Sequence, residues 1–367
     1  MATKRGDRPG ARPARRTSTA PSDEDTRVPT MADVARLAGV SVTTVSLVLN
    51  ERPDTGLRED TQQRVRDAVL ALRYRPNRQA RALVNQRSHT LGFIGERLGT
   101  PFAGRIISGA HDLVRAHDSV LFIMDAEDEI ELAEAVEELI SRRVDGILVA
   151  TEGTRHVRLP ASIARVPAIL VNCLMPGARV PSLLPNEELG GRQAARMLLD
   201  VGHREVACLA GEIDSWAAKR RVKGFRAELA QAGIAPRSVP VRWGDWRAES
   251  GHALTHEVMA RRRPPTGLFL GNDRMALGAY FALNELGLRV PDDVSVVGYD
   301  DQEELADSVR PPLSTLHLPF YEMGRLAAHH LVEQTVGTLP KQVLLDCPPV
   351  LRGSVAEPIS RSRVRPA

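Results

Sequence analysis

Residues 32–50 read ADVARLAGVSVTTVSLVLN, and this stretch decides the fold of the N-terminal part of the chain. Thr30 followed by Asp33 forms a capping-box pattern, which predicts that a helix begins there. Gly39 ends this helix, because glycine is favoured where the backbone needs a positive φ angle. Ser41 then caps a second helix directly after the first. Two short helices joined by a tight turn with glycine indicate a helix-turn-helix unit.

The residues of these two helices divide into a buried side and an outer side. The predicted buried side consists of Val34, Leu37, Ala38, Val45, Val48 and Leu49. In a helix-turn-helix unit the second helix enters the major groove of DNA, with its N-terminal residues at the base edges. Short side chains suit this position, since they can contact thymine methyl groups and hydrogen-bond to bases. The residues predicted to face the major groove are Ser41, Val42, Thr43, Thr44, Ser46 and Asn50.

A third helix and a basic segment follow. Thr61 is the predicted N-cap of the helix, and Val65, Val69 and Leu72 form its apolar stripe. Tyr74 is expected to end it, because Pro76 follows. The DNA-contacting set is expected to include Thr30, Leu47 and Tyr74 as well.

Residues 76–87 read PNRQARALVNQR and predict a short hinge helix. Asn77 can cap it, and Arg78, Arg81 and Arg87 lie on its outer positions with Leu83 among them. An exposed leucine between arginines is typical of a wedge that enters a minor-groove base step. In the alternative interpretation, Leu83 packs between two hinge helices. Asn77, Arg78, Arg81 and Leu83 are therefore predicted DNA-binding residues.

Charge and composition agree with contact between the N-terminal part and a polyanion. Residues 1–90 hold 17 Lys and Arg against 10 Asp and Glu, whereas the whole chain of 367 residues has a net charge of only +3. Residues 1–28 are basic and rich in Pro, Gly and Ser, without the apolar core of a signal peptide, which predicts a disordered tail. No apolar stretch approaches the ~18 residues of a membrane span, so no membrane partner is expected. The cysteines, Cys173, Cys208 and Cys347, form no CxxC pair, which favours the reducing cytoplasm.

From residue 90 onward, short β-rich runs alternate with helical segments. The strand candidates are LGFIG, VLFIMD, GILVA, AILVN, VACLA, GLFLG and VSVVGYD. This βα repeat predicts an α/β fold, with parallel sheets covered by helices on both faces. The repeat is too long for one sheet, so we expect two Rossmann-like subdomains.

Polar side chains gather where these strands end. Asn172 ends AILVN, Asn272 follows GLFL, and Asp300 follows VSVVG. Trp246 follows VPVR, and Arg221 lies near the start of a helix. In open α/β sheets ligands bind outside the carboxyl ends of the strands. Amide, carboxylate and guanidinium groups around an indole ring suit a polyol, although Trp246 alone could be core packing and Asp300 alone a helix cap.

Four longer stretches resemble the LacI/GalR (lac repressor) family of bacterial transcriptional regulators. They are TMADVARLAGVSVTTVSLVLN, YRPNRQARALVNQRSHTLGFIG, GNDRMALGAYFALNELGLRVPDDVSVVGYDD and PPLSTLHLPF, and the resemblance spans about residues 29–356. It implies a core like the periplasmic binding proteins, with crossovers between lobes near 184–186, 316–318 and 346–348.

The resemblance also implies site residues. Asn172, Arg221, Trp246, Asn272 and Asp300 match effector-pocket positions of sugar-responsive members, and Phe102 and Phe320 are expected apolar walls, with Trp216 as a candidate further wall. Many relatives have arginine in place of Leu47, and sugar-binding relatives often have a polar residue in place of Leu318.

The predicted organisation has four parts. These are a disordered basic tail (1–28), a helix-turn-helix domain (29–76), a hinge helix and linker (77–88), and an effector-binding and dimerisation core (89–360). Within the core, one subdomain is expected at about 89–185 and 318–346, and the other at about 186–315 and 348–360.

The expected function is a repressor whose binding to double-stranded operator DNA is controlled by a small molecule, expected to be a sugar. The alternative is a sugar-binding or sugar-modifying protein that carries a DNA-binding head. We expect no catalytic residue and no cofactor, because the chain lacks GxxxxGK[ST] and GxSxG motifs. We also expect no metal, because His252 and His256 are four residues apart but lack a third ligand nearby in the sequence.

A single helix-turn-helix contacts too little DNA for tight specific binding. We therefore expect a homodimer on a near-palindromic operator. The polar C-terminal stretch VLRGSVAEPISRSRVRPA has no leucine heptads, so a dimer is favoured over a tetramer. The expected location is the cytoplasm, in association with the nucleoid.

Overall fold

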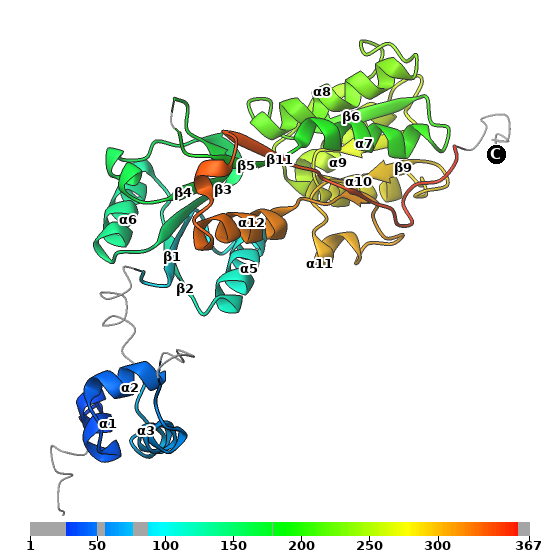
Figure 1. Ribbon diagram of the computed structural model, residues 1–367. Helices are drawn as coiled ribbons and strands as arrows, with labels where there is room; N and C mark the ends of the chain where they lie inside the picture. The colour runs from blue at the N-terminus through cyan, green and yellow to red at the C-terminus, as the bar shows by residue number, and fades with distance from the viewer. Residues whose placement is uncertain (1–26, 50–55, 76–86, 178, 359–367) are drawn as a thin grey trace, which may run out of the picture. The chain divides into compact units, whose positions relative to one another are not determined.

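The computed structural model describes residues 27–49, 56–75, 87–177 and 179–358 (Figure 1). Contacts between Cα atoms divide the chain into two compact units, Met1–Asn85 and Gln86–Ala367, which are described separately below. The predictions for the tail up to residue 26 and for Asn50, Asn77, Arg78, Arg81 and Leu83 lie outside the described residues.

The first unit contains the predicted helix-turn-helix. Helix α1 (Met31–Ala38) and helix α2 (Val42–Leu49) meet at an angle of 102°. The backbone N–H of Thr30 donates to Oδ2 of Asp33 at 2.9 Å, so the predicted capping box forms. Gly39 ends α1 with φ of 65°, as its position in the sequence predicts. Helix α3 (Glu59–Ala71) completes the unit.

Three predictions for this unit are corrected by the structure. Leu37 is 56% exposed, and Ala35 is buried instead, because the side of α1 that meets α3 is narrow and centres on Val34 and Ala38. Helix α3 begins at Glu59, before the predicted cap at Thr61, and the acidic residues of its first turn suit the positive end of the helix dipole. The helix also ends at residue 71, before Tyr74.

The left-handed conformation of Gly39 gives a testable prediction for this unit. Gly39→Ala is expected to destabilise it by about 1–2 kcal/mol, because an L residue with a Cβ pays that cost at positive φ. A Cβ there would meet nothing closer than the guanidinium of Arg64 at 3.6 Å, so the cost comes from the backbone and not from a clash. Hydrogen exchange of the α1 amides should accelerate about 5- to 30-fold in the full chain. Gly39→Asn is the matched control, since asparagine tolerates this conformation, and equal exchange rates in both variants would contradict the prediction.

The N-terminal lobe of the second unit is a parallel six-stranded sheet with the order β11-β5-β4-β3-β1-β2. Its strands are β1 (Thr90–Gly95), β2 (Val120–Asp125), β3 (Gly146–His156), β4 (Ala168–Leu174), β5 (Ser182–Pro185) and β11 (Gln342–Leu345). Helices α5 (Pro101–Ala116) and α12 (Phe320–Val332) cover one face, and α6 (Glu129–Ser141) with the 3-10 turn η1 (Ala161–Arg165) covers the other.

The C-terminal lobe is a parallel four-stranded sheet with the order β7-β6-β8-β9. Its strands are β6 (Val206–Ala210), β7 (Val241–Trp243), β8 (Gly267–Leu270) and β9 (Ser295–Val297). Helices α7 (Glu187–Leu199) and α8 (Trp216–Gln231) pack on one face, and α9 (Ala248–Met259) and α10 (Asp273–Glu285) pack on the other (Figure 1). The remaining elements are α11 (Glu303–Ala306), η2 (Val336–Thr338) and the antiparallel pair β10 (Thr315–Leu316) and β12 (Pro349–Val350). The predicted fold of two parallel α/β sheets is confirmed, and the domain limits given above stay predictions.

The segments that join the two lobes are hydrogen-bonded to one another. Nδ2 of Asn186 donates to Oδ1 of Asp346 at 3.1 Å, which links the segment after β5 to the segment after β11. The backbone N–H of His317 donates to the carbonyl of Pro348 at 2.9 Å. This bond links the segment after β10 to the segment between β11 and β12. The segments that connect the two lobes are therefore held together by hydrogen bonds.

No single helix among the described residues is both long and apolar enough to cross a membrane. Helices α1 and α2 pass the same test of length and composition only when they are joined across their bend.

Candidate functional site

A cavity of about 430 Å³ lies between the two lobes of the second unit. Both lobes contribute to its lining, because strands of each sheet end toward it. All seven predicted effector residues line this one cavity: Phe102, Asn172, Arg221, Trp246, Asn272, Asp300 and Phe320. The structure thus brings together side chains that are up to 218 residues apart in the sequence.

Asn172 forms the floor of the cavity on the side of the N-terminal lobe. It lies in β4, two residues before the strand ends, and is only 2% exposed, with a positive φ of 58°. Its Oδ1 accepts a hydrogen bond from the hydroxyl of Thr154, and its Nδ2 donates to the carbonyl of Glu152 at 2.9 Å. The amide therefore ties β4 to the end of β3, which fixes its orientation before any ligand arrives.

The guanidinium of Arg221 donates its hydrogen bonds mainly to other groups of the protein. Its Nε and Nη2 donate to the two carboxylate oxygens of Glu187, at 2.7 and 2.9 Å. Its Nη1 donates to the carbonyl of Gly271 at 2.7 Å, and the guanidinium lies 3.6 Å from the centre of the Tyr299 ring. Glu187 is 2% exposed and Arg221 is 5% exposed, so this bidentate ion pair is buried.

The carboxylate of Asp300 is less tightly bound by protein donors than that of Glu187. Its Oδ1 lies 3.5 Å from Nη1 of Arg221, a longer separation than the bonds to Glu187. Burial raises the pKa of Asp300 well above its ordinary value, and the charge of Arg221 opposes this rise. Hydroxyl donors from a ligand would stabilise the ionised carboxylate. Asp300 is thus suited to accept hydrogen bonds inside the cavity.

Asn272 and Trp246 form a connected part of the opposite wall. Oδ1 of Asn272 caps α10 by accepting from the N–H of Met275 at 2.9 Å, and its Nδ2 donates to the carbonyl of Trp246 at 3.1 Å. A helix cap was the alternative role of Asp300 in the sequence. In the structure it is Asn272 that caps a helix. Trp246 is half-buried and lines the cavity, so its ring is not simply core packing.

Three of these residues adopt a left-handed backbone conformation. The φ angles are 58° for Asn172, 68° for Trp246 and 111° for Asp300. Such conformations are costly for residues with a Cβ, and they concentrate at binding and catalytic sites. The backbone geometry is independent support for a functional cavity.

Several charged residues of the cavity were missed from the sequence. The cavity is also lined by Arg97, Glu152, Glu187, Glu212, Asp245, Arg247 and Arg274. Arg97, Glu212 and Asp245 each follow a strand within two residues, so the same strand-end rule would have found them. Glu152 lies within β3, two residues after the predicted run GILVA. With Arg221 and Asp300, the lining holds four arginines and five carboxylates. Two of the arginines pair within the lining, Arg97 with Glu152 at 2.9 Å and Arg221 with Glu187, and Arg247 pairs with Glu249 outside it at 3.4 Å.

An apolar partition separates this cavity from a second one. The rings of Phe102 and Phe320 pack edge to face, with centroids 5.8 Å apart. Both rings, Leu318 and Asp300 also line a neighbouring cavity of about 640 Å³. Trp216 is not part of either lining. It lies under the guanidinium of Arg220 at 4.2 Å and borders a different cavity, so the prediction of a further wall there is wrong.

In the first unit, α2 presents the outer side that the sequence predicts. Ser41, Val42 and Thr43 are exposed, and Thr44, Ser46 and Leu47 are half-buried, whereas Val45 and Val48 are buried. Oγ of Ser41 accepts from the N–H of Thr44 at 3.1 Å and so caps the helix. Their contacts with DNA stay predictions.

Thr30 and Tyr74, two further members of the predicted DNA-contacting set, differ in their exposure. Thr30 is exposed beside the start of α1. Tyr74 is 7% exposed and packs in the core of the unit with Val34 and Val65, because the chain turns back after α3. Its burial gives it a structural role, and we propose no DNA contact for it.

Comparisons with known proteins agree with this geometry. The family described as "Bacterial regulatory proteins, lacI family" matches residues 30–77, and the "Periplasmic binding protein-like domain" matches residues 195–355. The ribose operon repressor of Escherichia coli (strain K12) is 34% identical over 333 residues, which cover 89% of this chain and 99% of that protein.

Two solved structures are similar over most of the chain. A lac repressor dimer bound to operator and the anti-inducer ONPF has a TM-score of 0.73 at 29% identity, covering 90% of this chain and 100% of that one. A complex of the transcriptional regulator CelR with cellobiose has a TM-score of 0.61 at 30% identity, covering 89% and 99%.

Proposed function

Because the chain belongs to the LacI family of bacterial transcriptional regulators, we propose that it is a repressor controlled by a small neutral polyol, expected to be a sugar. The polyol binds in the cavity between the lobes and changes the affinity for operator DNA. The convergence of all seven predicted residues on that cavity carries this proposal. Its volume of about 430 Å³ falls within the range of about 300–1,000 Å³ typical of small-molecule sites.

The balance of charge in the cavity favours a neutral ligand. Four arginines face five carboxylates, and the two most buried charges, Arg221 and Glu187, neutralise each other. A phosphorylated ligand needs an excess of cationic donors, which this lining lacks. Asp300 supplies a buried acceptor for ligand hydroxyls, and Trp246 supplies a flat face for sugar C–H groups. The similar CelR structure contains cellobiose, which supports a sugar as the class of ligand.

On the DNA side, the exposed residues at the start of α2 are proposed to read the major groove. Ser41, Val42 and Thr43 combine hydroxyl groups with a short apolar side chain, as direct readout requires. We infer a homodimer on a near-palindromic operator, and the similar lac repressor structure is a dimer bound to operator. Such a repressor works in the cytoplasm, associated with the nucleoid while it is bound.

The test joins a selection of DNA to a screen of ligands. An operator is first selected from a random library with the full chain, and neutral mono- and disaccharides, their phosphate esters and purines are then screened by thermal shift. A neutral sugar is expected to raise the melting temperature by about 2–4 °C for each kcal/mol of binding energy and to release the operator. Responses confined to phosphate esters or purines would contradict the proposal. Recovery of the ligand unchanged after prolonged incubation separates a sensor from a sugar-modifying protein.

A further inference from the structure

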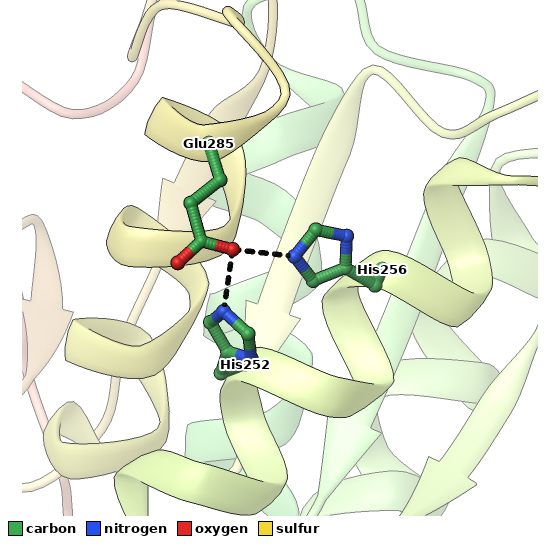
Figure 2. A group of neighbouring side chains, drawn as sticks. All are labelled: His252, His256 and Glu285. Carbon is green, nitrogen blue, oxygen red and sulfur yellow. Dashed lines mark hydrogen bonds and ion pairs between the residues drawn. The ribbon is translucent and has the colours of Figure 1, made fainter.

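Two imidazoles and a carboxylate converge on the surface of the C-terminal lobe, outside the cavity already described. His252 and His256 lie one turn apart on α9, and Glu285 is the last residue of α10. Nε2 of His252 is 2.9 Å and Nε2 of His256 is 3.0 Å from the same oxygen, Oε2 of Glu285 (Figure 2). The third ligand that the sequence seemed to lack is thus supplied by another helix, 29 residues beyond His256.

We propose that His252, His256 and Glu285 form a binding site for a divalent transition metal ion of the zinc class. Zinc takes imidazole nitrogen at about 2.0–2.1 Å and carboxylate oxygen at about 2.0–2.2 Å in a tetrahedral arrangement. Ligand atoms around such an ion lie about 3.3 Å from one another. The N···O separations in the cluster therefore need to open by only a few tenths of an ångström. Three protein ligands leave the fourth position to water.

The protonation of the cluster is compatible with metal binding. Without metal, each Nε2–H donates to Oε2 of Glu285. A bound ion replaces these two hydrogen bonds, and each neutral imidazole then carries its proton on Nδ1. Oε2 of Glu285 lies within 3.0 Å of both Nε2 atoms, so the three ligand atoms already face one another before an ion binds. The side chains are 36%, 36% and 57% exposed, so an ion reaches them without opening of the lobe.

The two helices hold the ligands in a fixed frame. A Cβ on Gly278 of α10 would lie 1.9 Å from the carbonyl oxygen of Ala248 on α9. A Cβ on Gly251 would lie 2.1 Å from the carbonyl oxygen of Met275. Glycine at both positions lets the backbones touch, so the two helices cannot slide without losing this packing. A metal ion would bind across this rigid pair, and it is therefore expected to stabilise the C-terminal lobe.

The test uses the full chain without a histidine tag and zinc as the probe. Competition with a chromophoric chelator is expected to show one zinc ion per chain, and zinc should raise the melting temperature. His256→Gln and Glu285→Gln should each weaken zinc binding by at least about tenfold. Changes to residues that only support metal ligands already cost about that much, and these two residues are proposed ligands themselves. Both side chains are on the surface, and Glu285→Gln keeps a hydrogen-bond acceptor, so circular dichroism should show native folding.

The matched control is His329→Gln. It removes an exposed imidazole from a second pair of histidines, His329 and His330 on α12 of the N-terminal lobe. Zinc should bind this variant as it binds the unaltered chain. The proposal is overturned if the unaltered chain binds no stoichiometric zinc, or if His256→Gln and Glu285→Gln retain its affinity. The first result would leave a hydrogen-bonded His–Glu cluster only, and the second would locate the ion elsewhere.

Discussion

Arg221→Met should destabilise the chain by about 3–5 kcal/mol, a large share of the stability of an ordinary domain. The substitution keeps an unbranched apolar stem but removes the guanidinium group that pairs with Glu187. Glu187 is 2% exposed and receives two of the N–H groups of Arg221, so it would be left as an uncompensated buried charge. Equilibrium unfolding in urea measures the loss as a lower transition midpoint at constant slope.

Two variants make this prediction specific. Arg220→Ala, one residue earlier on α8, removes an exposed guanidinium that stacks on Trp216 and should cost only about 0.5–1 kcal/mol. Adding Glu187→Gln to Arg221→Met removes the uncompensated charge and should recover part of the loss. A loss below 1 kcal/mol for Arg221→Met would show that the buried ion pair does not hold α7 to α8. The pair also means that Arg221 is unsuited to a clean test of effector binding.

The parallel topology explains why the cavity could be predicted from the sequence. Asn172, Asn272 and Asp300 each follow a buried apolar run, and the carboxyl ends of parallel strands meet at one edge of a sheet. Local sequence was therefore enough to place these residues together. Strands β5 and β11 were missed because they are defined by pairing between distant segments, β5 with β4 and β11 with β5.

Contacts between distant elements could not be predicted in the same way. Glu187 pairs with Arg221 across 34 residues, and Glu285 meets His256 across 29, because helix packing brings them together. Leu37 was assigned to the buried side by its spacing, but on an eight-residue helix the spacing fits more than one side. Packing against α3 selected the side of Ala35. The spacing of residues thus predicted the elements, and the packing between elements decided which charges are paired.

Asp300→Asn should raise the effector concentration needed for a response about ten- to a hundredfold. The affinity for operator without effector should stay unchanged. The carboxylate lines the cavity, and its one side-chain partner among the described residues is Arg221 at 3.5 Å. Its loss removes charge-assisted hydrogen bonds to ligand hydroxyls, which are worth about 1.5–3 kcal/mol. Asparagine has the same shape and tolerates positive φ, and it removes a charge whose burial is unfavourable, so the fold should survive.

The matched control for this prediction is Asp301→Asn, because Asp301 is also buried but does not line the 430 Å³ cavity. Its carboxylate accepts from Arg352 at 2.8 Å, and its other oxygen lies 3.1 Å from Nδ1 of His317. Asp301→Asn should therefore lower stability without moving the effector concentration that releases half of the operator.

A ligand shifts the DNA-bound population only by its difference in affinity for two lobe arrangements, and a site lined by both lobes meets that condition. Fluorescence anisotropy of labelled operator, with and without effector, measures both quantities. If Asp300→Asn responds at the same effector concentration as the unaltered chain, the cavity is not the effector site; if it loses operator binding without effector, Asp300 is structural.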